Sequence, residues 1–280
     1  MGIRAYLVPV LVTMSGVAAA GADRTPTPVP LSIDGKGGII VEVRVNAAGP
    51  FRFILDTGGT RTIVSDDLAR EIAAPTVAKS EVVTSAGSDL RLVVRLTSLA
   101  VASATADDLL AVVVPGVHLA RLGRGVRGLL GQDFLSAFNY TLDYRRRRLT
   151  WDEPLACDGP GAARMTAAEG RFVMALEGDR GTPLRLVPDS GADMPVLFRL
   201  SARAASGSTA AVATLTSLGD GERLARLATM PTLRVGSVTI RHLEAYVVER
   251  ADADVDGLLP LHGFSSVSFA AGGACLVARR

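Results

Sequence analysis

Two aspartates each end an apolar stretch, one in each half of this chain. The repeated pattern raises the question whether their carboxyl groups act as a pair. Asp56 ends a run in FRFILDTGGTRTIV, residues 51–64, and Asp189 ends another in PLRLVPDSGADMPVLF, residues 183–198. Each precedes a hydroxyl residue and a glycine, which taken singly is also typical of a strand ending in a tight turn. Two carboxyl groups brought together cannot both ionise easily, so they would share one proton and could act as general acid and base.

Further landmarks lie at nearly equal distances from the two aspartates, which indicates an internal duplication. The landmarks are short and differ in composition, so agreement among several of them is unlikely to arise by chance. The matched pairs are TSAG at Thr84 with TSLG at Thr216, LAVAS at Leu99 with LRVGS at Leu233, and GLLG at 128–131 with GLLP at 257–260.

Most segments between these landmarks are short, rich in Val, Leu, Ile and Thr, and punctuated by glycine, as β-strands and hairpins are. Helical patterning is limited to SDDLAREIAA, QDFLSAF and VLFRLSARAA, with Ser65 as a candidate N-cap of the first. We therefore expect a mainly β protein of two similar lobes, residues 23–156 and 157–280. The joint is expected around residues 151–170, where Gly, Pro and Ala replace the strand pattern.

The combination of apolar strand, Asp-Thr/Ser-Gly turn and later Leu-Leu element resembles the aspartic proteases over essentially the whole mature chain. The sequence looks most like bacterial, exported, two-lobed relatives with retropepsin-like motifs in a pepsin-like single chain. The resemblance implies the acid-protease fold with an active-site cleft between the lobes. The motifs that carry it are LDTGG at 55–59 with GLLG, and PDSGA at 188–192 with GLLP.

The resemblance also implies an activity and a mechanism. Asp56 and Asp189 would form a catalytic dyad in which the ionised member takes a proton from water and the protonated member donates a hydrogen bond to the scissile carbonyl. The chain would then be an aspartic-type endopeptidase that acts on peptide or protein substrates without a cofactor.

Supporting roles follow from the same resemblance. Thr57 and Ser190 could hold the two catalytic loops together through their hydroxyls, while Gly58 and Gly191 would allow the backbone to approach the partner lobe. The TSAG and TSLG tips correspond to the flap and its counterpart. The candidate substrate contacts there are Ser85, Gly87, Ser217 and Gly219.

Two prolines depart from the family pattern and keep other functions open. Pro260 stands where the family usually has glycine, and Pro188 removes a backbone donor directly before the second aspartate. No tyrosine occupies the first flap. The alternatives are a catalytically impaired peptide-binding protein that keeps the fold, and a structural β scaffold whose aspartates only cap turns.

The first 22 residues have the layout of a secretory signal peptide. A single charge at Arg4 precedes an apolar stretch, and small residues at Ala20 and Ala22 provide cleavage sites. The stretch is short for a bilayer span and is interrupted by Pro9. We expect a cleaved leader, an exported, periplasmic or secreted mature chain, no stable membrane span, and a monomer.

Composition and scattered motifs exclude several other classes. A net charge of +2 provides no strong field for nucleic acid. The three histidines and two cysteines show no metal-ligand spacing, so no metal site is expected.

In an oxidising compartment Cys157 and Cys275 could pair, and we favour a disulfide over free thiols. GRGVRG formally matches a dinucleotide-binding loop, but no alternating strand-helix pattern surrounds it. The arginine run at 145–148 is more simply a solvated hairpin turn.

Overall fold

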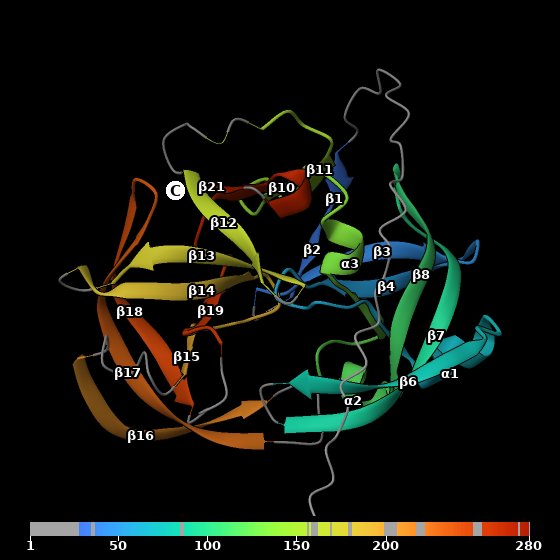
Figure 1. Cartoon of the computed structure of the whole chain (residues 1–280), viewed down its shortest axis with the longest axis horizontal. Helices are drawn as coiled ribbons and strands as arrows, with labels where there is room; N and C mark the ends of the chain where they lie inside the picture. The colour runs from blue at the N-terminus through green and yellow to red at the C-terminus, as the bar shows by residue number, and fades with distance from the viewer. Residues whose placement is uncertain are drawn as a thin grey trace, which may run out of the picture.

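The structure is a computed structural model. It describes residues 28–34, 37–84, 87–155, 157, 162–168, 170–178, 181–198, 206–216, 222–248, 254–273 and 275–279. Strands dominate the described residues and form two lobes that flank a group of central strands (Figure 1). The prediction of a mainly β, two-lobed protein is confirmed. The predicted leader, residues 1–22, lies outside the described residues.

The first lobe is built on an eight-stranded sheet in which β3 also pairs with β7. Its buried positions are mostly Val, Leu, Ile and Phe, which suit a pleated surface packed on both faces. The strand order is β2 (Ser32–Ile33), β3 (Ile39–Val45), β4 (Ala48–Leu55), β9 (Val126–Leu130), β5 (Ile63–Ser65), β8 (Ala104–Val114), β7 (Gly87–Val101) and β6 (Thr76–Thr84).

The second lobe repeats this order strand for strand, with each label ten higher, and β13 pairs with β17 as β3 does with β7. The duplication inferred from sequence landmarks is therefore a duplication of topology. The order is β12 (Ala162–Ala168), β13 (Arg171–Glu177), β14 (Pro183–Asp189), β19 (Gly257–Pro260), β15 (Val196–Phe198), β18 (Val238–Val248), β17 (Glu222–Val235) and β16 (Ser206–Thr216).

Central strands from both halves join the lobes. Their order is β1 (Val29–Pro30), β11 (Arg148–Trp151), β10 (Tyr140–Asp143), β20 (Ser266–Phe269) and β21 (Cys275–Arg279), and β21 then pairs with β12. The antiparallel pair β10–β20 lies at the middle of this arrangement. Strands β11 and β1 follow on one side, and β21 and the start of β12 follow on the other. A pseudo-twofold axis therefore passes through the β10–β20 pair. The expected lobe boundary falls between β11 and β12, although β10 of the first half pairs with β20 of the second.

Helices are short, and three of them lie in the first lobe. They are α1 (Asp66–Glu71), α2 (Gly116–Ala120) and α3 (Gln132–Leu135). The Ser65 hydroxyl caps α1 by accepting the Leu68 N–H at 3.2 Å, as expected of its sequence. The helix predicted in VLFRLSARAA is wrong at its start, because residues 196–198 are buried as β15 between β18 and β19. Its remainder lies outside the described residues.

The core is continuous through both lobes and the central strands. Its centre is aromatic: Tyr140 stacks on Phe269 with ring centroids 4.7 Å apart, and Trp151 meets Phe134 edge-on at 6.0 Å. Cys157 and Cys275 form a disulfide between the segment after β11 and strand β21. None of the helices in the described part of the chain is long and apolar enough to span a bilayer.

Candidate active site

The two aspartates leave their sheets at equivalent points. Leu55, the last residue of β4, pairs in parallel with Leu130 of β9. In the second lobe Pro188 of β14 pairs in parallel with Leu259 of β19. Each aspartate is the next residue after a matched rung of a parallel strand pair. The duplicated backbone therefore delivers two carboxyl groups to the same place between the lobes.

The carboxyl groups of Asp56 and Asp189 lie within hydrogen-bonding reach of each other. Each also accepts two backbone N–H groups from its own turn, which fixes the plane of the carboxylate. The donors are Gly58 and Gly59, at 3.0 and 2.9 Å from Asp56 Oδ1, and Gly191 and Ala192, at 2.8 and 3.1 Å from Asp189 Oδ1.

Burial and mutual repulsion make this pair hold a proton. Burial first, and then the charge of Asp56, raise the pKa of Asp189 to about 7 against the lowering effect of the Gly191 and Ala192 N–H groups. Burial also raises the pKa of Asp56, while the N–H groups of Gly59 and Gly58 lower it. The two groups titrate as a pair, so one proton stays on the pair well above the usual range for a carboxyl group.

The hydroxyls of Thr57 and Ser190 cross between the lobes directly beneath the aspartates. Thr57 Oγ1 donates to the Pro188 carbonyl at 2.7 Å and accepts the Ser190 N–H at 2.9 Å. Ser190 Oγ donates to the Leu55 carbonyl at 2.6 Å and accepts the Thr57 N–H at 3.1 Å. All four bonds are buried, so they tie the two catalytic loops into one unit.

The glycines of the two turns are not equally constrained. A Cβ atom on Gly58 would lie 2.6 Å from Asp189 Cγ, which is well inside van der Waals contact. A Cβ on Gly191 would come no closer than 3.3 Å to Asp189 Oδ1 and 3.5 Å to Asp56. Only the first turn presses its backbone against the carboxyl group of the other lobe.

Both prolines fit the strand pairing around the second aspartate. Pro188 keeps its place in β14, and its carbonyl is the acceptor for the Thr57 hydroxyl. Pro260 pairs with Asp189 at the last rung of β14 and β19. The missing N–H groups therefore do not interrupt the parallel ladder that positions Asp189.

The first catalytic loop has side-chain support that sequence reasoning missed. Gln132 is 2% exposed, and its Nε2 donates to the Thr57 carbonyl at 2.8 Å. Its neighbour Asp133 accepts the Thr62 N–H at 2.9 Å and the Thr62 hydroxyl at 2.7 Å. A Gln-Asp pair directly after Leu-Leu-Gly was an available signal, because polar residues beside a buried strand end need partners.

A buried tyrosine also lies near the pair. The Tyr144 hydroxyl forms no hydrogen bond in the part of the chain that the structure describes. Burial raises the pKa of Tyr144, and the charge of Asp189 raises it further. Tyr144 precedes the arginine run of an exposed hairpin, so no local pattern predicted that its ring turns inward.

The flap candidates are only partly placed. Gly87 begins β7, opposite Thr84 at the end of β6. Ser85, Ser217 and Gly219 lie outside the described residues. The two hairpins that carry these tips, β6–β7 and β16–β17, are long and extend from their own lobes toward the middle of the molecule (Figure 1).

A hollow of about 710 Å³ lies beside the second catalytic loop. Pro260, the pairing partner of Asp189, lines it, and Met194 and Leu243 contribute apolar surface. His242 and His262 also line this hollow. Among the described residues no group of three or more His, Cys, Asp or Glu side chains is arranged to hold a metal ion.

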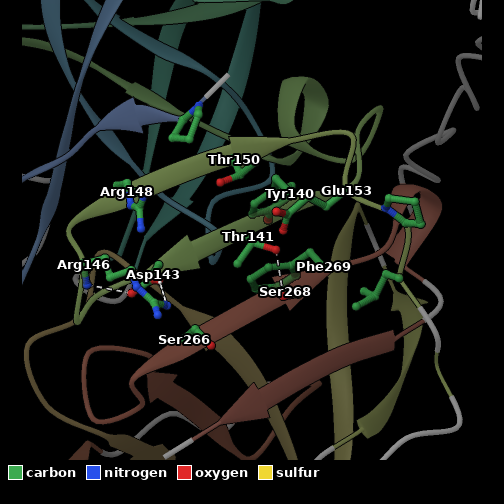
Figure 2. A pocket seen from close by; sticks show the side chains of 13 residues that line it. Tyr140, Thr141, Asp143, Arg146, Arg148, Thr150, Glu153, Ser266, Ser268 and Phe269 are labelled. Atoms are coloured by element: carbon green, nitrogen blue, oxygen red, sulfur yellow. Dashed lines mark hydrogen bonds and ion pairs between the residues drawn. The ribbon is translucent and has the colours of Figure 1, made fainter. Parts of the chain in front are cut away.

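A smaller hollow of about 310 Å³ lies on a polar face of the central strands (Figure 2). Thr141 and Ser268 are hydrogen-bonded there at 2.8 Å across the β10–β20 pair. Arg146 forms an ion pair with Asp143, in which Nη1 lies 3.1 Å from Oδ2. None of these side chains belongs to the two catalytic loops, so this hollow is separate from the aspartate pair.

Comparison with known proteins supports the family and the fold. The aspartyl protease family model matches residues 41–134 and 175–261. The aspartic proteinase from Irpex lacteus has the same fold, with a TM-score of 0.55 at 12% identity over 91% of this chain and 97% of that chain. A retropepsin-like aspartic protease from Rickettsia conorii is 15% identical over 45% of this chain and 90% of that chain, with a TM-score of 0.33.

A search of curated proteins finds no match. The family model nevertheless covers well over half of the chain and includes both aspartate turns. The chain therefore belongs to the aspartyl protease family and is a hydrolase of the aspartic endopeptidase type.

Proposed function

We propose that Asp56 and Asp189 are the catalytic dyad of this endopeptidase, one from each lobe. The observation that carries the proposal is their contact in a buried site where burial raises both pKa values and that of Asp189 reaches about 7. A pair that keeps one proton from acid to neutral pH has both an acid and a base at hand. General acid–base catalysis of peptide hydrolysis needs both.

The reaction follows from the charges on this pair. The ionised carboxylate takes a proton from a water molecule as its oxygen attacks the scissile carbonyl carbon. The protonated carboxyl donates to the carbonyl oxygen and stabilises the charge that develops there. Collapse of the tetrahedral intermediate breaks the C–N bond, and the leaving nitrogen takes up a proton from the dyad. The bonds of Thr57 and Ser190 hold both carboxyl groups in place throughout.

Cleavage of a diverse peptide mixture between pH 3 and 8 tests this proposal. Asp56→Asn and Asp189→Asn are each expected to abolish cleavage, while Asp107→Asn, an exposed aspartate on β8, serves as the matched control. All variants are checked for folding by circular dichroism. Cleavage by a folded dyad variant at the wild-type rate would overturn the proposal. Peptide binding without cleavage by the wild type would support the impaired peptide-binding alternative.

We also propose that the chain is exported after cleavage of its leader behind Ala20 or Ala22 and acts as a monomer. The proposal is supported by the leader-like sequence and by a disulfide typical of an oxidising compartment. N-terminal sequencing of the protein recovered from a secreting host should give a start at Gly21 or Asp23. Sedimentation should give the mass of one chain. An intact Met1 or a stable dimer would contradict these points.

A further inference from the structure

Gln132 is a buried polar residue at a position where the second lobe has an apolar one. It follows the Leu-Leu-Gly element of the first lobe by one residue, and Leu261 holds the matching place after Leu-Leu-Pro. Both side chains are buried, at 2% and 0% exposed. Burying an amide in place of leucine destabilises the fold unless the amide forms hydrogen bonds. We therefore ask which groups the Gln132 amide binds.

The Gln132 side-chain amide binds the first catalytic loop. Its Nε2 donates to the Thr57 carbonyl at 2.8 Å, and its backbone N–H donates to the Gly59 carbonyl at 2.8 Å. The Thr57 carbonyl belongs to the same peptide group as the Gly58 N–H, which donates to Asp56 Oδ1 at 3.0 Å. A single rigid peptide plane thus has Gln132 at one end and the Asp56 carboxylate at the other.

The Gln132 side chain also lies near Tyr140 of the central strands. Burial raises the pKa of Tyr140, and the neighbouring Gln132 amide opposes that rise. Both Tyr140 Oη and Gln132 Oε1 are buried, and neither atom forms a hydrogen bond in the described part of the chain. Tyr140 is held by its stack on Phe269, and Figure 2 shows it on β10 beside that ring. The amide therefore lies between the central strands and the Asp56 turn and is bonded to the turn.

We propose that Gln132 is a positioning residue that orients and polarises the Thr57–Gly58 peptide group, and through it the Asp56 carboxylate, for the dyad reaction proposed above. A donor on the carbonyl strengthens the N–H at the other end of the peptide. The second loop lacks this device because Leu261 cannot donate. The dyad is then asymmetric by construction, with one carboxylate more firmly held than the other.

Three variants test the inference. Gln132→Met keeps the volume and removes the donor, Gln132→Glu keeps a donor only while its carboxyl is protonated, and Leu261→Met is the matched change in the other lobe. In Gln132→Met we expect kcat to fall about 10- to 100-fold with KM little changed. The acid limb of the pH profile should move up by roughly 0.5 to 1 pH unit, because the ionised Asp56 loses support.

The glutamate variant separates positioning from packing. Gln132→Glu should retain most of the wild-type kcat near pH 4 and lose it as pH rises, since its ionised carboxylate cannot donate to the Thr57 carbonyl. Leu261→Met should keep the wild-type profile. A folded Gln132→Met with wild-type kcat and acid limb overturns the inference. So does a Gln132→Glu profile identical to that of Gln132→Met.

A titration of the aspartate carboxyls by carbon-13 NMR keeps the test independent of cleavage. Gln132→Met should raise the lower apparent pKa of the pair relative to wild type, and an unchanged titration would defeat the inference. A wild type that cleaves nothing would defeat the proposed function instead. If Gln132→Met does not fold, Gln132→Leu, which introduces the residue found at the matching place of the other lobe, replaces it. We expect the same upward shift, and no shift there also overturns the inference.

Discussion

The two lobes share one strand order but hold their catalytic loops by different means. In the first lobe Gln132 supports the turn from behind, and the Thr62–Asp133 bonds fasten the chain that follows it. In the second lobe the matching residues are Leu261 and His262, and Leu261 offers no polar group. The duplicated backbone therefore explains where the carboxyl groups meet. It does not make them equivalent.

The contact between the loops shows the same inequality. The Thr57 and Ser190 bonds are reciprocal and similar in length, so the lobes are tied symmetrically at that level. At the level of the carboxyl groups, only Gly58 lies so close to the aspartate of the other lobe that a Cβ atom would overlap it. We infer that the first turn is the fixed reference and that the second has more room. The following predictions test this difference between the two turns.

The largest expected effect is that of a methyl group on the first glycine. Gly58→Ala should lower kcat at least about a hundredfold, because its Cβ would overlap Asp189 Cγ and push the dyad apart. Gly191→Ala should cost much less, since its Cβ meets nothing closer than 3.3 Å. Steady-state kinetics on one peptide substrate measures both. Equal losses would mean that the two turns are equally tight.

The second effect concerns stability and pH. The folded-state pKa of Asp189, about 7, lies above the ordinary value of 3.8, so folding is favoured most by this group below pH 4. Its contribution is lost as pH rises toward 7, at a slope of roughly 1 kcal/mol per pH unit. Asp189→Asn should flatten this part of the curve.

Urea unfolding at several pH values measures the slope. Asp107→Asn, the exposed control, should run parallel to the wild type. Asp56→Asn should also flatten the curve, because removing either carboxyl relieves the repulsion on the other. A slope in Asp189→Asn equal to that of the wild type would show that the pair does not hold a proton at neutral pH.

Sequence reasoning reached the backbone of this site but not its support. Repeated Asp-hydroxyl-Gly turns and Leu-Leu elements carry local patterns, and these predicted the topology and the meeting of Asp56 with Asp189. Tyr144 carries no such pattern, because its inward position depends on how a hairpin of the first half packs near the second catalytic loop. The same reason explains the error at β15, where pairing with β18 and β19 outweighs helical periodicity.

The third effect tests the part of the comparison that is symmetric. Thr57→Val and Ser190→Ala each remove one donated and one accepted buried bond, so each should lower the free energy of unfolding by about 1 to 3 kcal/mol. The two losses should be similar in chemical denaturation. A loss confined to one variant would show that the reciprocal bonds are unequal and that the asymmetry extends below the dyad.

The smallest effect lies at the periphery of the first lobe. Arg127 on β9 pairs with Asp67 and Glu71 of α1 at 2.9 and 2.8 Å, with half-exposed partners. Arg127→Gln should therefore lower the free energy of unfolding by less than about 1 kcal/mol and leave kcat unchanged. Arg171→Gln, which breaks a similar pair with Asp254 in the second lobe, is the matched variant.

Those two arginine variants limit where the difference between the lobes can matter. Arg127 is one residue before the Gly128–Gly131 element that carries Gln132 to the Asp56 turn. If Arg127→Gln lowers kcat severalfold while Arg171→Gln does not, helix α1 contributes to the position of that turn through β9. If both leave kcat unchanged, the functional asymmetry is confined to the buried residues behind the dyad, because a change one residue outside that element is not transmitted to it.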